Sequence, residues 1–345
     1  MLSNGPEAAL ETTRLMYSAW RKPVPEILLF PAELLALGPE ELERLLDEFL
    51  ALQVPAQDLP SLRIDLSFPV CLQTHRARVP PAPKPNILMA ITSIFAASCN
   101  PRASVGDLLS AFCTYDFVMP RRVLVRLFTN EWSEIDIYAW RPIDSTSSPL
   151  IIDRVSSYET FPGSAGHMFE DHITTNGPHW RNYTIQSLTI LHKGREIKIA
   201  VTGEIDGVDT ETGNPIEIKT RRLEGRKQNS TLALRNYFQS LIASVDTIFS
   251  GGYKYQQEWG RVVFKERDFS SLPTRAPSHL NTDAMMNLGM AKLCRIASKC
   301  RSRGVLYRAD ENRVYSTHSD VCMTQDLIHS LAKYVLQKTS SNIST

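Results

Sequence analysis

The sequence has no excess of charge of one sign, because 38 lysine and arginine residues nearly balance 37 aspartate and glutamate residues and leave a net charge of +1. This balance excludes a protein that binds nucleic acid through a uniformly basic surface. A protein that encloses a single strand needs only a locally basic channel, with aromatic side chains that stack on bases. The composition therefore permits a nucleic-acid function without indicating one.

Paired cysteines and long apolar runs are also missing. The six cysteines form no C-x-x-C pair and have no histidine at the spacing of a zinc site, which is typical of a reducing compartment. The polar first residues do not have the charged head and apolar stretch of a signal peptide, and no run is long enough to span a membrane. We therefore expect an intracellular protein, in the nucleus, the cytoplasm or both, with no membrane partner.

The size and apolar content of the chain are those of a globular protein. With 345 residues, of which 43% are hydrophobic, the chain can bury a large core. We expect one compact domain over 1–345 of mixed α+β class, with a twisted central β-sheet flanked by helices. No catalytic triad and no phosphate-binding glycine loop competes for the chemistry of this domain.

Hydrophobic periodicity predicts the coarse order of the elements. Residues 1–22 are predicted as an amphipathic helix or loose arm, and 39–53 as a helix. The pattern is strand-rich over 123–140 and 185–265, with a tight turn at KGR, residues 193–195. Further helices are predicted over 282–303 and 323–337. The apolar segments 87–99 and 105–113 are helices or strands that the pattern does not separate. In the helix over 282–303, the inward residues are predicted to be Met285, Leu288, Leu293 and Ile296.

The most informative stretch is GEIDGVDTETGNPIEIKT, residues 203–220. Glu204 and Asp206 lie two apart in its first strand-like run, and Glu217 and Lys219 lie two apart in its second. Side chains two apart on a strand share a face, and the GVDTETGNP between the runs is typical of a turn. The pattern predicts that three carboxylates and one ammonium meet on one surface.

Such a cluster needs compensation for its negative charge. Two carboxylates about 4 Å apart repel by roughly 4 kcal/mol at an effective dielectric constant of about 20, so the cluster requires cations or proton uptake. Oxygen donors favour Mg²⁺ or Mn²⁺. The alternative is an ordinary hairpin with Ile205, Ile216 and Ile218 on the core face and solvated charges. The small residues Ala200 and Thr202, which precede the acids on their face, favour a central strand that opens into a cleft.

Two further polar residues lie on either side of the hairpin. GHMFE, residues 166–170, carries Glu170 on a short helical run, although Met168 and Phe169 in the core with a solvated Glu170 would give the same pattern. Gln239 follows in an amphipathic helix. A half-buried amide needs partners, which a phosphate, a ligating carboxylate or a backbone carbonyl would supply.

The order GHMFE, GEID, EIK and RNYFQS resembles the signature of the DXO family of decapping and exoribonuclease enzymes, whose active-site plan is that of the PD-(D/E)XK nucleases. DFVMPRRVLVRLF, residues 116–128, is similar to the family's F-V-x-W-R-G motif, with Arg121 as the matching arginine. Residues 279–316 resemble the family's closing helix and strand. The resemblance covers about residues 111–320, so that 111–338 are interpreted as the catalytic core, 1–110 as a divergent N-terminal part and 339–345 as a flexible tail.

The resemblance implies a site for Mg²⁺ or Mn²⁺, with two ions. Asp206, Glu217 and the main-chain carbonyl of Ile218 would bind the ions directly, and Glu170 and Glu204 would bind them directly or through water. Two metals of this kind stabilise both the attacking and the leaving oxygen of an in-line displacement at phosphorus.

The resemblance also implies roles for three further side chains. Lys219 would orient or deprotonate the attacking water, and Arg121 and Gln239 would bind phosphate oxygens. The implied reaction is hydrolysis at an RNA 5′ end that carries a cap, a triphosphate, an NAD cap or a monophosphate, with or without 5′-to-3′ exonuclease activity. RRLEGRK, residues 221–227, either lines a channel for this RNA or forms a solvated loop.

The chain departs from the family pattern at three positions. Pro120 and Arg122 stand where the family has tryptophan and glycine, and Tyr253 stands where an arginine is expected. These changes favour a second reading, a weak or inactive relative that binds RNA ends or stabilises a partner exoribonuclease. A DNA nuclease with the same metal plan is a third reading.

Overall fold

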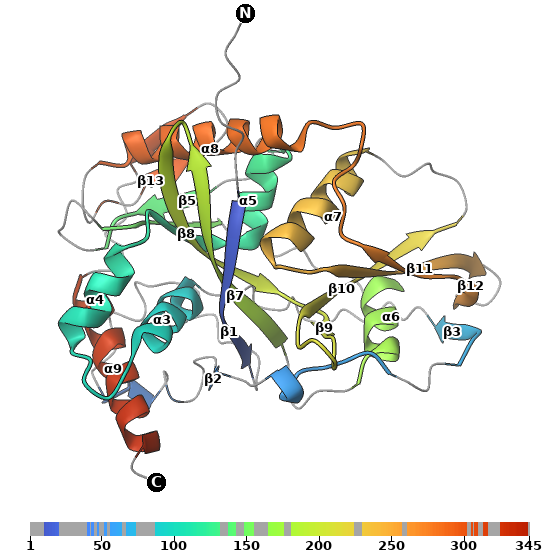
Figure 1. Ribbon diagram of the computed structural model, residues 1–345, viewed down its shortest axis with the longest axis horizontal. Coiled ribbons are helices and arrows are strands. Elements are labelled where there is room, and N and C mark those ends of the chain that lie inside the picture. Colours follow the sequence, from blue (N-terminus) through green and yellow to red (C-terminus); the bar gives the residue numbers. More distant parts are fainter. Residues whose placement is uncertain are drawn as a thin grey trace, which may run out of the picture.

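The computed structural model describes residues 10–20, 52–53, 56–63, 67–73, 87–131, 137–142, 148–154, 165–175, 181–223, 230–256, 261–301, 305, 307–309, 313–316 and 325–343, together with positions 40, 41, 43, 44 and 47. Within these residues the chain forms two β-sheets with helices packed around them (Figure 1). The expected mixed α+β class is confirmed.

The larger sheet has nine strands among the described residues and is mixed, because β4 pairs in parallel with both β6 and β8 while the other pairs are antiparallel. Across the sheet its strands are β14 (Val314–Ser316), β13 (Tyr307–Ala309), β5 (Ile137–Trp140), β6 (Leu150–Arg154), β4 (Phe117–Pro120), β8 (Arg195–Glu204), β7 (Arg181–His192), β1 (Leu10–Trp20) and β2 (Leu52–Gln53).

The smaller sheet has five strands in the described part of the chain. Across this sheet they are β3 (Val70–Gln73), β12 (Arg261–Pro273), β11 (Thr247–Gln256), β10 (Pro215–Arg222) and β9 (Gly207–Val208). Strands β10 and β11 run parallel, and the other neighbours are antiparallel. Because β8 ends at Glu204 and β9 begins at Gly207, the chain passes from one sheet to the other within the acidic motif.

Helices cover both faces of the larger sheet. One face packs on α5 (Arg121–Phe128), α7 (Ser230–Ile242) and α8 (Thr282–Lys299), and the other packs on α3 (Ile87–Ser98), α4 (Val105–Cys113) and α9 (Gln325–Ile343). Strand β8 has the alternation that this arrangement requires. Ile197, Ile199 and Val201 belong to the first core and Ala200 to the second, as the predicted strand pattern indicates.

The smaller sheet packs on α6 (Ala165–Ile173), the helix that carries the GHMFE motif. The ring of Phe169 stacks on that of Phe264 at 4.0 Å between centroids. A Cβ at Gly251 would lie 2.6 Å from the Phe169 ring, so glycine allows this close approach of helix and strand. Helix α6 thereby lies beside the hairpin of β9 and β10, which we call the acidic hairpin because Asp206 precedes it and Glu217 lies on it.

The first strand corrects the prediction of a helix or loose arm over 1–22. Residues 10–20 form β1, which pairs along its length with β7 and buries Met16 and Tyr17. A bulge between Arg14 and Met16 interrupts the two-residue alternation, so the isolated sequence does not have a clean strand pattern. Here the partner strand, rather than local preference, determines the structure.

Helix α5 corrects the strand-rich prediction over 123–140, of which only β5 is a strand among the described residues. All of its residues except Arg122 and Arg126 are buried. A short helix buried nearly all round has the same continuous apolar run as a buried strand, and periodicity cannot separate the two. The segments 87–99 and 105–113, left open by the sequence, contain the helices α3 and α4.

The C-terminal half agrees better with the predictions. The turn at Lys193 and Gly194 is confirmed, with φ of 52° and 76°. The helix predicted over 282–303 ends at Lys299, and Leu288 is 46% exposed, so its predicted inward position was wrong. The last helix continues to Ile343, beyond its predicted end. The helix predicted over 39–53 lies mostly outside the described residues, and it does not reach 53, since Leu52 and Gln53 form β2.

Among the described residues, no helix combines the length and the apolar character needed to cross a membrane. The cysteines that the structure describes, Cys71, Cys99, Cys113, Cys294 and Cys300, are all free thiols.

Candidate active site

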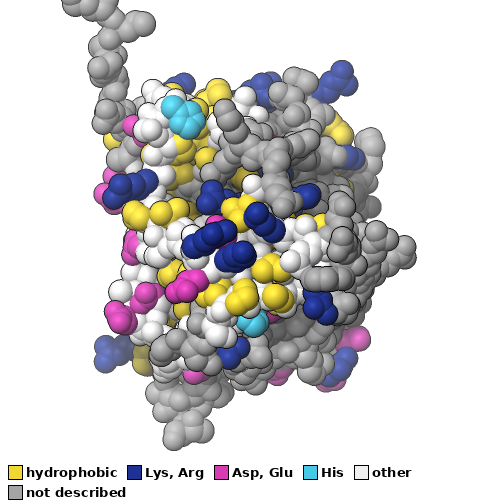
Figure 2. All heavy atoms as spheres, turned by 90° about the vertical axis from the view of Figure 1, so that its right-hand side faces the viewer, with side chains coloured by type: hydrophobic (Ala, Val, Ile, Leu, Met, Phe, Trp, Pro, Cys, Tyr) yellow, Lys and Arg dark blue, Asp and Glu magenta, His cyan; other side chains and the backbone are white. Residues whose placement is uncertain are grey.

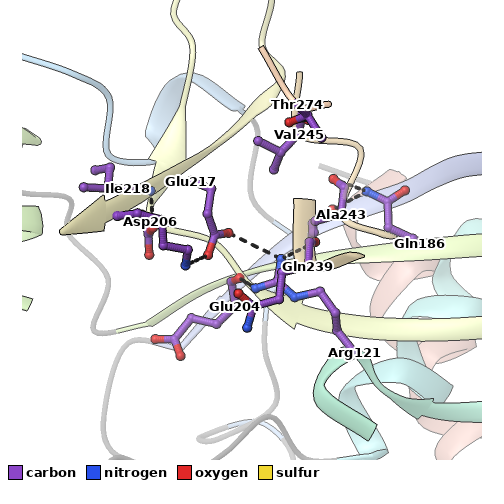
Figure 3. A network of polar contacts seen from close by, with 12 residues as sticks. Arg121, Gln186, Glu204, Asp206, Glu217, Ile218, Gln239, Ala243, Val245 and Thr274 are labelled. Carbon is purple, nitrogen blue, oxygen red and sulfur yellow. Dashed lines mark hydrogen bonds and ion pairs between the residues drawn. The ribbon is translucent and has the colours of Figure 1, made fainter. Parts of the chain in front are cut away.

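The acidic hairpin brings Asp206 and Glu217 together where the chain crosses between the sheets (Figure 3). Strands β9 and β10 pair antiparallel through Val208 with Pro215 and Gly207 with Ile216, which confirms the predicted turn. The Oδ2 atom of Asp206 accepts a hydrogen bond of 2.6 Å from the main-chain N–H of Ile218. This bond holds the Asp206 carboxylate against the strand that carries Glu217 and Lys219.

The environment of Asp206 disfavours its charged form. Burial raises the pKa of Asp206 well above its ordinary value, and the negative charges of Glu170 and Glu217 raise it further. The positive charge of Lys219 and the hydrogen bond from Ile218 oppose this shift without cancelling it. Glu170, from the GHMFE motif on α6, is thus near enough to act on the charge of Asp206, and its predicted role in binding metal remains a prediction.

Glu217 is compensated by two cations. Its side chain is 5% exposed, and burial alone would raise its pKa, but Lys219 and Arg121 outweigh burial and lower it. Lys219 donates a hydrogen bond to Oε1 of Glu217, and the Arg121 guanidinium lies 3.5 Å from Oε2. Burial would lower the pKa of Lys219, but the carboxylates of Glu217 and Asp206 raise it, so Lys219 is protonated at neutral pH.

Arg121, the first residue of α5, links three parts of the site. Its guanidinium donates hydrogen bonds to the main-chain carbonyls of Glu204, at 2.5 Å, and Gln239, at 3.2 Å, besides its ion pair with Glu217. A Cβ at Gly203 would lie 2.7 Å from Nε of Arg121, so only glycine leaves room for this side chain. The close approach of the Arg121 side chain therefore explains why the GEID motif begins with glycine.

Glu204 and Gln239 take part in the site through their main chains. Both side chains are half-buried, and in Figure 3 the Glu204 carboxylate points away from the Arg121 guanidinium. The roles predicted for these two side chains, in binding metal and phosphate, remain predictions.

The donor set has the chemistry of a site for a hard divalent cation. Carboxylate oxygens and a main-chain carbonyl are the ligands that Mg²⁺ and Mn²⁺ prefer. The pKa of Asp206 is raised first by burial and then by the two neighbouring carboxylates, both of which a bound cation would offset. In the described part of the chain, however, no three His, Cys, Asp or Glu side chains gather closely enough to hold an ion. Glu217 is bound by the protein's own cations instead, so its charge is compensated without a metal.

Two residues missed by the sequence analysis hold the acidic hairpin from outside. The hydroxyl of Tyr17 on β1 donates a hydrogen bond of 2.7 Å to the carbonyl of Gly213, and Arg14 donates to the same carbonyl at 3.2 Å. Gly213, with φ of 66°, lies in the turn between β9 and β10. Neither residue lies in a motif, because their contact depends on a strand pairing that the sequence did not reveal.

The departures from the family pattern have visible consequences. Pro120 ends β4 and precedes α5, with Arg121 as the next residue. The Tyr253 ring lies 5.4 Å from that of Phe264, in the apolar cluster under α6. This position therefore contributes packing where the family pattern has a cation.

Solved structures with the same fold exist, although no family model and no curated protein matches the chain. The chain is similar to Candida albicans Rai1, solved in complex with pU5-Mn²⁺, with 13% identity, 96% of each chain covered and a TM-score of 0.56. It is also similar to S. pombe Rai1, solved in complex with 3′-FADP, with 12% identity, 91% of this chain and 97% of that chain covered, and a TM-score of 0.53. The motif resemblance to the DXO family thus extends to the architecture, and the chain has the fold of the Rai1 structures.

Proposed function

We propose that this protein is a metal-dependent hydrolase of RNA 5′ ends. The observation that carries the proposal is the pairing of Asp206, a carboxylate whose burial raises its pKa, with Glu217, Lys219 and Arg121 at the crossing between the sheets. Titratable groups with opposed shifts at one buried site are typical of catalytic centres. The fold adds support, since the Rai1 structures were solved with pU5-Mn²⁺ and with 3′-FADP.

The ligands proposed for Mg²⁺ or Mn²⁺ are Asp206 and Glu217 with the carbonyl of Ile218, aided by Glu170 and Glu204. When bound, two such ions would activate water and stabilise the charge that develops on the phosphate oxygens. The Ile218 N–H already fixes Oδ2 of Asp206, which leaves the other carboxylate oxygen for a ligand.

Lys219 acts in this proposal as a donor. Because the adjoining carboxylates raise its pKa, it stays protonated at neutral pH, and it orients a water or phosphate oxygen rather than removing a proton. Its contact with Glu217 would have to loosen as metal and substrate bind.

Arg121 combines a positioning role with the proposed binding of phosphate. Its hydrogen bonds to the carbonyls of Glu204 and Gln239 fix the end of β8 and helix α7 around Glu217. The remaining N–H groups of the guanidinium, with the Gln239 amide, would bind phosphate oxygens of the RNA end.

The test uses RNAs with capped, triphosphate, NAD-capped and monophosphate 5′ ends in Mg²⁺ or Mn²⁺. We expect release of the 5′ group by the wild-type protein, and loss of this release in the double variant Glu204→Ala, Asp206→Ala. A matched control removes two exposed acids, Glu196→Ala and Glu211→Ala, and should keep activity. Equal products from the site variant and the wild type would refute the proposal.

The second candidate is an RNA-end-binding protein without hydrolysis, which includes a protein that stabilises a partner exoribonuclease. It is favoured by the compensation of Glu217 by Lys219 and Arg121 and by the tyrosine at position 253. In the same assay, binding of monophosphate RNA without turnover on any substrate would support this candidate. Turnover of single-stranded DNA at the rate of RNA would instead support a DNA nuclease.

A further inference from the structure

The face of the smaller sheet opposite α6 carries a row of charged side chains, which starts at the candidate active site and becomes exposed along the strands. On β10, Ile216 and Ile218 face α6. Residues of the other parity, Glu217, Lys219 and Arg221, therefore lie on the opposite face. Along this row the side chains change from buried at Glu217 to half-buried at Lys219 and exposed at Arg221.

Strands β11 and β12 continue the row with positive charges. Lys254 lies opposite Val263 and Gln256 opposite Arg261, while the odd-numbered Tyr253 and Tyr255 pack toward α6. Lys254 and Arg261 thus share the face of Arg221, and both are exposed. We call Arg221, Lys254 and Arg261 the basic strip.

The basic strip has a regular spacing and one direction. Arg221 lies two residues beyond Lys219 on β10. Lys254 lies two residues beyond Gly252, the partner of Arg221 on β11, and Arg261 lies two residues from Val263, the partner of Lys254 on β12. Strand geometry places successive Cα atoms roughly 7–8 Å apart in this row, which extends roughly 20 Å diagonally from the site. Such a row fits an extended polyanion better than a compact ligand.

The charges around the strip leave it positive. Among the described residues, no ion pair involves Arg221, Lys254 or Arg261. Two acids lie on this face: Glu217, which pairs with Lys219 and Arg121, and Asp268, next to Gly252, whose carboxylate is 3.9 Å from Arg267. On the side of the molecule where β11, β12 and β3 lie, Figure 2 shows Lys and Arg side chains gathered near the middle.

We infer that the basic strip binds the phosphate backbone of single-stranded RNA downstream of the 5′ end, an inference that rests on the proposed function. The 5′ end lies at Glu217 and Lys219, and the following nucleotides run along Arg221, Lys254 and Arg261. These side chains contact phosphates and not bases, so the strip is independent of sequence and adds affinity only for RNA long enough to reach it.

The test compares a dinucleotide, which is too short to run along the strip, with an RNA of about 16 nucleotides, both with a 5′ phosphate. Binding is measured in EDTA by fluorescence anisotropy at several salt concentrations. The strip variant is Arg221→Gln, Lys254→Gln, Arg261→Gln. The control, Arg102→Gln, Lys299→Gln, Lys333→Gln, changes net charge equally at exposed positions elsewhere.

We expect the strip variant to bind the long RNA at least about tenfold more weakly at low salt, with its salt slope reduced by about 2, while the control and the short RNA are unaffected. Unchanged binding of the long RNA would overturn the inference. An equal loss on the short RNA, or a lowered melting temperature, would also overturn it, because the residues would then act in the site or the fold.

Two further measurements distinguish RNA binding at the strip from hydrolysis at the site and from binding to a lipid surface. Hydrolysis of the short RNA in Mn²⁺ tests the proposed function alone: if it fails while the strip variant still loses long-RNA binding, the strip stands and the hydrolase proposal falls. Vesicles of phosphatidylserine and phosphatidylcholine test a lipid surface as the polyanion. Loss of vesicle binding in the strip variant with long-RNA binding retained would overturn the inference.

Discussion

Two half-buried carboxylates, Glu131 and Asp206, have pKa values that move in opposite directions. At Glu131, which follows α5, burial raises the pKa, but hydrogen bonds from Arg235 and Thr129 and the charge of Arg126 outweigh it and lower the pKa. At Asp206, burial and the neighbouring acids win and raise the pKa.

The difference lies in the number of donors. Glu131 accepts hydrogen bonds from Thr129 at 2.6 Å and from Nε of Arg235 at 3.1 Å, with Arg126 at 3.1 Å. Asp206 accepts one from the Ile218 N–H, and its surroundings hold two further acids. The contacts of Glu131 connect α5 to α7, whereas the carboxylate of Asp206 is left for a cation or a proton to stabilise. Carboxylates in surroundings that disfavour their charged form are found most often at functional sites.

The largest expected effect comes from Asp206→Asn. The change keeps an oxygen for the Ile218 N–H and removes the disfavoured charge, so we expect RNA 5′-end hydrolysis to fall at least about a hundredfold. The free energy of unfolding should rise by on the order of 1 kcal/mol. Rate assays and thermal melts check both results; a variant that loses stability as well as activity would contradict the comparison.

The opposite result is expected for Glu131→Gln. Removing this charge takes the Glu131 carboxylate away from Arg126 and Arg235, so the free energy of unfolding should fall by about 2–3 kcal/mol with hydrolysis retained. Because the folded pKa of Glu131 lies below its ordinary 4.5, the stabilisation is complete above that pH and is lost as pH falls through the folded pKa. The difference in melting temperature between wild type and variant should therefore be full at neutral pH and shrink as the pH falls below 4.5. A difference that does not change with pH would argue against the ion pairs of Glu131.

Gly203→Ala tests whether Arg121 belongs to the charge balance of the site. The new Cβ would lie 2.7 Å from Nε of Arg121 and displace it from Glu217, at an overpacking cost of about 1–3 kcal/mol. Activity should fall with it. Gly106→Ala is the matched control, since its Cβ would meet its nearest neighbour, Oγ of Ser104, at 3.5 Å. Equal activity of both glycine variants would remove Arg121 from the site.

The smallest effect is expected for Tyr17→Phe. Loss of the hydroxyl that donates to the Gly213 carbonyl should cost about 1 kcal/mol. Faster hydrogen exchange is expected in the turn between β9 and β10, with no change around Glu131. Exchange rates that rise equally in both regions would indicate general loosening and contradict a local brace.

The sequence predicted those parts of the site that are local. Glu217 and Lys219 lie two apart on β10, so their shared face follows from strand geometry. The strand predicted through Glu204 and Asp206 was wrong, because β8 ends at Glu204 and Asp206 lies in the bend before β9. The contacts of Arg121 did not follow, because its carbonyl partners come from β8 and α7, distant in sequence. The sequence also did not predict that Arg121 begins a helix, because the apolar run that follows it is continuous and matches a buried strand equally well.

The fold divides in the same way. The hairpin at Lys193 and the helix α8 have local signals of turn and periodicity, and both were predicted. Strand β1 has no such signal, because its bulge breaks the alternation and β7 supplies its hydrogen bonds. The brace from Tyr17 was invisible for the same reason.

The bond between Tyr17 and Gly213 also orders events during synthesis. The two residues are separated by 196 positions, and a ribosome adds about 5–20 residues per second. Gly213 is therefore synthesised roughly 10–40 s after Tyr17. Until β7 emerges, β1 has only its short pairing with β2, and its anchor at Gly213 is made later still. A nascent chain arrested shortly before Gly213 would therefore contain the motif up to Asp206 but not the hairpin, and the site would become competent only late in translation.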